Sequence, residues 1–196
     1  MTLLLYAVVP VDAHVPDGFD ALHGARAGVV HAEQEVGHPA DRDAVVAFGR
    51  TIERIARDGP VLPMRFGASV ADLEELRVLI AENEEAWAAR LEAVAGCCEL
   101  IVHLVHPPSA EPRVVGTQGV EAHDAVRDEL RAVLRPWLRE AKSLTIAASD
   151  RIAVLVPLAQ ANRARTRLER WAADRHGLEI EITGPWPPFS FCNPAA

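Results

Sequence analysis

The chain has 196 residues, which is enough for one large domain or two small ones. Hydrophobic residues make up 49% and charged residues 24%, a composition that allows a packed core and argues against disorder. The formal net charge of −8 argues against nonspecific binding to nucleic acid or to anionic membranes.

The N-terminus and the cysteines indicate a cytoplasmic protein. The opening MTLLLYAVVP has no basic segment and no small-residue cleavage site, so it predicts a first strand rather than a signal peptide. No apolar run approaches the roughly 20 residues that a membrane span needs. The three cysteines, two of them adjacent, provide no disulfide framework, which favours a reducing compartment.

The first half, residues 1–96, is predicted to form an α/β domain. The apolar run 3–9, ended by Pro10, predicts a buried strand. A loop is expected over 10–24 and a second strand over 28–36. Residues 41–58 predict a helix that ends at Gly59-Pro60. Its apolar residues recur at spacings of three and four and are expected to face the core: Val45, Phe48, Ile52 and Ile55.

The segment GPVLPMRFGASVADLEEL, residues 59–76, predicts a strand followed by a helix. The strand is expected over 61–66, and Pro63 removes one backbone donor, so this strand should lie at a sheet edge or carry a bulge. Ser69 and Asp72 resemble a capping pair. The helix that follows is expected to end at Gly96 and to direct these residues toward the core: Leu73, Leu76, Ile80, Trp87, Leu91 and Val94.

The second half, residues 97–196, is predicted to form a ferredoxin-like domain with a proline-rich closing tail. Strands are expected over 99–105, 144–148, 151–156 and 178–183, and helices over 120–138 and 159–175. Pro136 should bend or end the first helix, and Ser149-Asp150 should form a tight turn between two strands. The resulting βαββαβ order predicts a ferredoxin-like sheet, and the whole chain is assigned to the α+β class.

The motifs of common enzymes and metal proteins do not occur in this sequence. No glycine-rich loop is followed by Lys-Ser or Lys-Thr, and no G-x-S-x-G elbow is present. Cys97, Cys98, His103 and His106 lie close in sequence, but on an extended strand they alternate between faces and cannot chelate locally. We therefore predict no catalytic residue, no metal and no cofactor.

Two basic features leave alternatives open. Arg65 and Gly67 precede a helix N-terminus and could attract an anion there, or Arg65 could pair with a carboxylate while Gly67 supplies an unusual backbone angle. Five arginines lie between 163 and 175, and they are expected to spread around their helix. The predicted ferredoxin-like strands contain no aromatic residue for base stacking, which argues against RNA binding.

Three segments resemble the gas vesicle protein F/L family. PVLPMRFGASVADLEELRVLI, residues 60–80, is similar to the family's signature strand, turn and acidic helix. LEIEITGPWPPFSF, residues 178–191, is similar to its closing segment, and the opening LLLYAVVP to its first strand. The resemblance implies two domains and a role in forming gas vesicles, as an assembly factor or minor vesicle-associated component. It also implies binding to the hydrophobic main shell protein and to other accessory proteins, without enzymatic activity.

These motifs also indicate where a partner would bind. An edge strand or an apolar groove could hold an apolar shell subunit, by β-augmentation or by helix-in-groove capture. The candidate partner-binding residues are Pro63, Arg65, Phe66, Gly67, Pro185, Trp186 and Phe189. The tail over 184–191 is expected to run as polyproline II, and its aromatic residues could instead pack within the protein itself.

A second interpretation is a small-molecule-binding protein or enzyme on a ferredoxin-like sheet. It predicts a deep pocket in which polar groups converge, around Arg65, His103 and Arg151.

Overall fold

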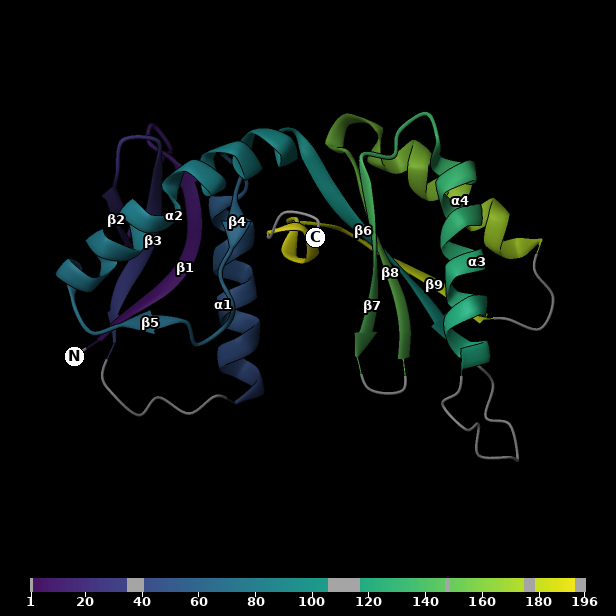
Figure 1. Ribbon diagram of the computed structural model, residues 1–196, viewed down its shortest axis with the longest axis horizontal. Coiled ribbons are helices and arrows are strands. Elements are labelled where there is room, and N and C mark those ends of the chain that lie inside the picture. Colours follow the sequence, from purple (N-terminus) through teal and green to yellow (C-terminus); the bar gives the residue numbers. More distant parts are fainter. Residues whose placement is uncertain (1, 35–40, 106–116, 147–148, 175–178, 193–196) are drawn as a thin grey trace. The chain divides into compact units, whose positions relative to one another are not determined.

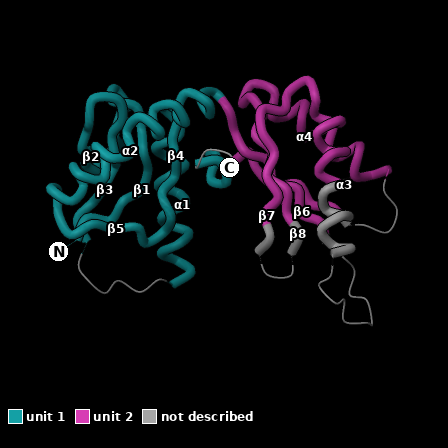
Figure 2. Tube along the Cα trace, in the orientation of Figure 1, with its two compact units in different colours: residues 1–96, 187–196 teal, residues 97–186 magenta. Residues whose placement is uncertain are grey.

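The computed structural model describes residues 2–34, 41–105, 117–146, 149–174 and 179–192. Its contacts divide the chain into two compact units, residues 1–96 with 187–196 and residues 97–186 (Figures 1 and 2). Each unit holds one antiparallel sheet with helices, as the predicted α+β class requires. The closing residues 187–196 group with the first unit, whereas the sequence assigned the tail to the second. That each half is a domain able to fold by itself stays a prediction.

The sheet of the first unit is built around β1 (Thr2–Pro10), whose apolar sequence suits a central strand. β3 (Ala27–Gln34) pairs with one side of β1, and β2 (Asp20–His23) pairs with β3. The other side of β1 pairs with two very short strands, β4 (Leu62–Pro63) and β5 (Ser69–Val70).

Two helices complete the first unit, and each begins at an aspartate. The Asp41 carboxylate accepts a hydrogen bond from the backbone of Ala44, which fixes the start of α1 (Arg42–Ile55). The Asp72 carboxylate accepts from Glu74 and Glu75 at the start of α2 (Leu73–Val94). α1 packs on the β1 face that carries Ala7 and Val9, and α2 packs against β1, β2 and β3.

The expected elements of this unit are present, with four corrections. β2 lies inside the segment expected to be a loop. The strand expected over 61–66 is only two residues long, because Arg65 to Ala68 form a turn. Ser69 belongs to β5, so the cap of α2 is Asp72 with Glu75, whose carboxylate accepts from the backbone of Ala71. Two residues expected in the core are exposed, Val45 at 47% and Leu73 at 42%.

The second unit has the predicted ferredoxin-like topology, and its strand order confirms that part of the prediction. The elements are β6 (Cys97–Val105), α3 (Thr117–Leu134), β7 (Glu140–Ile146), β8 (Ser149–Pro157), η1 (Leu158–Gln160), α4 (Ala161–Ala173) and β9 (Glu179–Trp186). The sheet order is β7–β8–β6–β9, with every neighbouring pair antiparallel (Figure 1). Alternate residues of β6, Cys98 to Leu104, face the helices and form a buried core with α3 and α4.

The sequence misplaced several boundaries in the second unit. α3 ends at Leu134, four residues before the expected end and two before Pro136, so of the two effects expected of the proline the helix ends rather than bends. Ser149 and Asp150 belong to β8 rather than to a turn, since Ser149 pairs with Ile146. The loop expected over 107–119 falls mostly outside the described residues, as does His106.

The tail also differs from its prediction. Instead of becoming polyproline II at Gly184, β9 continues to Trp186, which pairs with Glu99. A register shift between Glu99 and Ile101 leaves Gly184 and Pro185 outside the regular ladder, and β9 is an edge strand, so the proline is tolerated. After Pro187 and Pro188 the chain forms the short helix η2 (Phe189–Phe191).

A buried histidine is expected to make the stability of the protein depend on pH. His31 lies on β3, is 6% exposed, and burial lowers its pKa, although Asp20 and Glu33 oppose the shift. Since the unfolded chain binds more protons than the folded one near pH 6, the free energy of unfolding should fall as pH drops below the unfolded pKa of about 6.5. Urea titrations at pH 7.5 and 5.5 would measure this fall.

The matched variants for this prediction are His31→Leu and His14→Gln. His31→Leu should reduce the pH dependence, and His14→Gln controls for the loss of an exposed histidine side chain. The pKa of His103 is also lowered, by burial and by Arg151, so some pH dependence should persist in His31→Leu. An undiminished fall in that variant would contradict the assignment.

A candidate binding groove beside the short edge strand

The segment after β4 leaves the sheet in a tight turn that presents Arg65. The backbone of Met64 donates to the carbonyl of Tyr6, and the backbone of Ala68 donates to the carbonyl of Arg65, which closes a four-residue turn. Gly67 is the third residue of this turn and has φ +83°, the backbone angle that a type II turn requires. Of the two readings of this motif, the structure supports an unusual backbone angle at Gly67.

A cavity of about 620 Å³ lies along this turn, and we call it the groove. Its lining residues come from β1, α1, the β4 segment, α2 and the tail: Val8, Val45, Phe48, Gly49, Leu62, Pro63, Met64, Arg65, Phe66, Trp87, Phe189 and Cys192. Among these described residues Arg65 carries the one charge. The groove is therefore an apolar surface with a single cation beside it.

Aromatic contacts hold the base of the groove in place. The ring of Phe48 stacks on that of Tyr6 with 5.1 Å between centroids, and it meets the ring of Phe66 edge-on at 5.4 Å. Tyr6 in turn contacts Phe19 edge-on at 4.9 Å, and burial raises the pKa of Tyr6. Such pairs add about 0.5–1.5 kcal/mol each beyond the area they bury, so this surface is preorganised.

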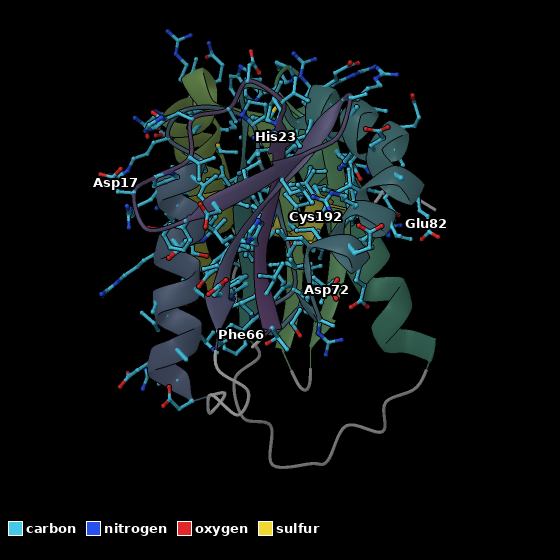
Figure 3. All side chains as sticks on the ribbon, turned by 90° about the vertical axis from the view of Figure 1, so that its left-hand side faces the viewer. Asp17, His23, Phe66, Asp72, Glu82 and Cys192 are labelled. Carbon is cyan, nitrogen blue, oxygen red and sulfur yellow. The ribbon has the colours of Figure 1, made fainter. Side chains whose placement is uncertain are left out.

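The tail brings a residue from the far end of the sequence into the groove. Phe191 is fully buried, and its carbonyl accepts a hydrogen bond from Nε of Arg90 on α2. The Cys192 thiol contacts the carbonyls of Pro188 and Phe189 at 3.4 and 3.3 Å. While Phe191 holds the tail to α2, Phe189 remains 40% exposed and lines the groove. Figure 3 labels Phe66 and Cys192, which line the groove from separate segments.

Four of the seven candidate partner-binding residues meet in the groove: Pro63, Arg65, Phe66 and Phe189. Gly67 lies next to it in the turn, whereas Pro185 and Trp186 belong to β9 of the second unit. Sequence reasoning missed Val45, Trp87 and Cys192. The available signal was the apolar stripe of α1, since Val45 lies one turn before the buried Phe48 and was assigned to the core.

The groups expected for the enzyme interpretation are divided between the two units. Arg65 lies in the first unit, whereas His103 and Arg151 are neighbours on β6 and β8 of the second. Nε2 of His103 lies 3.1 Å from the Thr183 hydroxyl. Burial raises the pKa of the Cys98 thiol to about 11. Cys98 lies in the core of the second unit.

The described residues provide neither a metal-binding cluster nor a helix that could span a membrane. No three side chains of the types His, Cys, Asp and Glu come together there as a metal site would require. None of the helices in that part of the chain combines the length and apolarity needed to cross a membrane.

Comparison with known proteins assigns the chain to a family. The family model described as gas vesicle synthesis protein GvpL/GvpF matches residues 5–125 and 115–193. Gas vesicle protein F of Streptomyces sp. (strain CB03234) is 25% identical, over 87% of this chain and 85% of that protein.

Two crystal structures share the fold. GvpF from Microcystis aeruginosa matches with a TM-score of 0.77 and 14% identity over 98% of this chain and 99% of that one. GvpF from Anabaena sp. PCC7120 matches with a TM-score of 0.79 and 14% identity over 100% of this chain and 97% of that one. The chain therefore belongs to the GvpL/GvpF family of gas vesicle synthesis proteins.

Proposed function

We propose that this protein acts in gas vesicle formation as an assembly factor that binds the hydrophobic main shell protein through the groove. The observation that carries the proposal is that the PVLPMRFG segment and the distant tail residues Phe189 and Cys192 line one apolar surface. Binding to other accessory proteins, association with the vesicle and action in the cytoplasm belong to the same proposal, as does a role in binding rather than catalysis.

The geometry favours capture of apolar side chains over strand addition. β4 offers only two residues, and Pro63 has no backbone N–H to donate, so the edge gives little for another strand to pair with. Val45 and Phe189 instead expose apolar surface at 47% and 40% beside the rigid aromatic base. Covering such surface contributes about 25 cal/mol per Å². Arg65 could pair with a carboxylate or a helix C-terminus of the bound segment.

A pull-down with two exposed aromatic residues tests this proposal. Phe189 lines the groove and Trp186 does not, although they are 40% and 38% exposed. Phe189→Ala should reduce capture of the co-expressed shell protein by about three- to eightfold, since covering the exposed 40% of a side chain whose full burial contributes about 1.5–3 kcal/mol contributes about 0.6–1.2 kcal/mol. Trp186→Ala should have little effect.

Two further measurements belong to this experiment. They are the capture of shell protein by Arg65→Ala and the yield of buoyant vesicles in cells. Arg65→Ala should weaken capture less than Phe189→Ala, because an exposed ion pair contributes about 0–1 kcal/mol. Both variants should melt like the parent and lower the yield of buoyant vesicles when they replace it in cells. Equal capture by the parent and Phe189→Ala, with loss in Trp186→Ala, would place the contact elsewhere.

A further inference from the structure

The two units of the chain carry very different charge. Residues 97–186 contain twelve basic and twelve acidic residues, whereas the rest of the chain contains eight and sixteen, so the whole net charge of −8 resides outside the second unit. Within the second unit, three arginines of α4 follow one another at i, i+4 and i+7: Arg163, Arg167 and Arg170. They lie on one helical face, whereas Arg165 lies on another, so the expected spread of arginines around this helix includes a stripe of three that the sequence reasoning missed.

These arginines line a cavity of about 380 Å³ together with Trp137, Asn162 and Thr166. We call this the arginine site. The other two arginines of the cluster are not part of it, because Arg165 donates to the carbonyl of Gly184 on β9 and Arg175 lies outside the described residues. All six lining residues belong to the second unit.

The positive charge of the arginine site is not neutralised by the described part of the chain. Arg163 contacts only the side-chain oxygen of Gln160, at 3.4 Å, and no described carboxylate pairs with Arg167 or Arg170. Like charges at i, i+3 and i, i+4 repel one another, and the first turn of α4 contains an arginine but no acidic residue against the positive end of the helix. An anionic ligand would relieve both effects.

Trp137 contributes an apolar surface next to the three arginines, and its position is fixed by the fold. Its backbone donates to the carbonyl of Leu134 at 2.8 Å, in the turn that ends α3, and its side chain packs against the core of the unit. The indole ring is half-buried, so one part of it remains open toward the arginines. A ligand for this site therefore combines negative charge with an apolar group.

We propose that the arginine site binds an acidic helical segment of a partner protein, with carboxylates at i, i+4 and i+7 and an apolar side chain that packs on Trp137. Seven residues of α4 span about 10 Å, which is too far for one carboxylate or phosphate to contact all three guanidinium groups. A second helix repeats the same spacing, and each guanidinium can bind a carboxylate with two hydrogen bonds. A nucleic acid fits less well, since base stacking uses several exposed aromatic rings and the half-buried Trp137 is the one aromatic residue among the described residues of the site.

A designed peptide provides the probe. The peptide is an alanine-based helix with glutamates at i, i+4 and i+7 and a leucine at i+3, and its control carries glutamine at the three acidic positions. The full-length protein is titrated with each peptide while the indole N–H resonance of Trp137, assigned with Trp137→Phe, is followed by NMR. The acidic peptide should shift this resonance in a saturable and salt-sensitive way, and the glutamine peptide should not.

Two triple variants with the same loss of charge separate the site from general electrostatics. Arg163→Gln/Arg167→Gln/Arg170→Gln should raise the Kd of the acidic peptide at least about tenfold, because it removes three ion pairs. Arg42→Gln/Arg50→Gln/Arg57→Gln, which alters exposed arginines of the first unit, should change it less than about twofold. All these variants alter exposed side chains, so their melting should match that of the parent.

Several results would overturn this proposal. They are equal shifts with the two peptides, equal weakening in the two triple variants, or tighter binding of an oligonucleotide or polyphosphate than of the acidic peptide. Salt-sensitive self-association that the α4 triple variant abolishes would also overturn it, because the site would then hold a second copy. None of these measurements involves the groove, so their failure and that of the proposed function are distinguishable.

Discussion

Gly184→Ala is expected to lower the free energy of unfolding by about 3 kcal/mol, as steric clashes and backbone strain add together. Gly184 has φ +108°, and a Cβ atom placed on it would lie 2.5 Å from the carbonyl oxygen of Glu99 and 3.2 Å from the side chain of Leu100. The nearest atom belongs to the backbone of the central strand β6, so relief requires β9 to move. Urea unfolding followed by circular dichroism would measure the loss.

Gly18→Ala is the control for this substitution. Gly18 has φ +90°, but a Cβ atom there would meet nothing within 4 Å. Its replacement should therefore cost only the strain of a left-handed backbone, about 1 kcal/mol. Equal losses in the two variants would mean that the approach of β9 to β6 at Gly184 does not limit stability.

Phe48→Ala is expected to lower the free energy of unfolding by about 3–5 kcal/mol, the usual cost of truncating a buried aromatic side chain. The Phe48 ring is 6% exposed and contacts the rings of both Tyr6 and Phe66, so its removal leaves a cavity beneath the groove. The same urea titration measures this loss, and the variant should also bind the proposed partner poorly because Phe66 loses its support.

Val45→Ala truncates a residue that lies on the same face of α1 as Phe48 but outside the buried core. Val45 lies three residues before Phe48 and is 47% exposed, so its truncation should change stability by less than about 0.5 kcal/mol. If the groove binds an apolar partner, Val45→Ala should nevertheless weaken capture of the shell protein. A variant that binds as the parent does, or one that unfolds as readily as Phe48→Ala, would contradict this division of roles.

Strong local signals predicted most of the elements. The continuous apolar run of β1 and Gly96 after the end of α2 are read from neighbouring residues, and each stands where it was expected. Pro63 identified an edge strand because a missing N–H is a property of the residue itself. The spacing of Arg163, Arg167 and Arg170 was also present in the sequence, and it was missed because all five arginines were considered together.

Longer-range features were beyond such reasoning. β2 carries no strong strand pattern, and it exists because its backbone pairs with β3. β9 passes Pro185 because a bulge opposite β6 lets the proline avoid the ladder, which depends on a strand some 80 residues earlier. Val45 was assigned to the core because a periodic stripe indicates which face is apolar but not how far along the helix that face is covered.

The sequence by itself determined the family, the α+β class and the ferredoxin-like order of the second half, because motifs, caps and hydrophobic periods are written in adjacent residues. Only the tertiary structure decided that Phe189 lies beside Arg65 and Phe66, and that Trp137 lies beside the arginines of α4. Both surfaces join segments far apart in the chain, and such contacts follow from how buried side chains pack rather than from any local pattern.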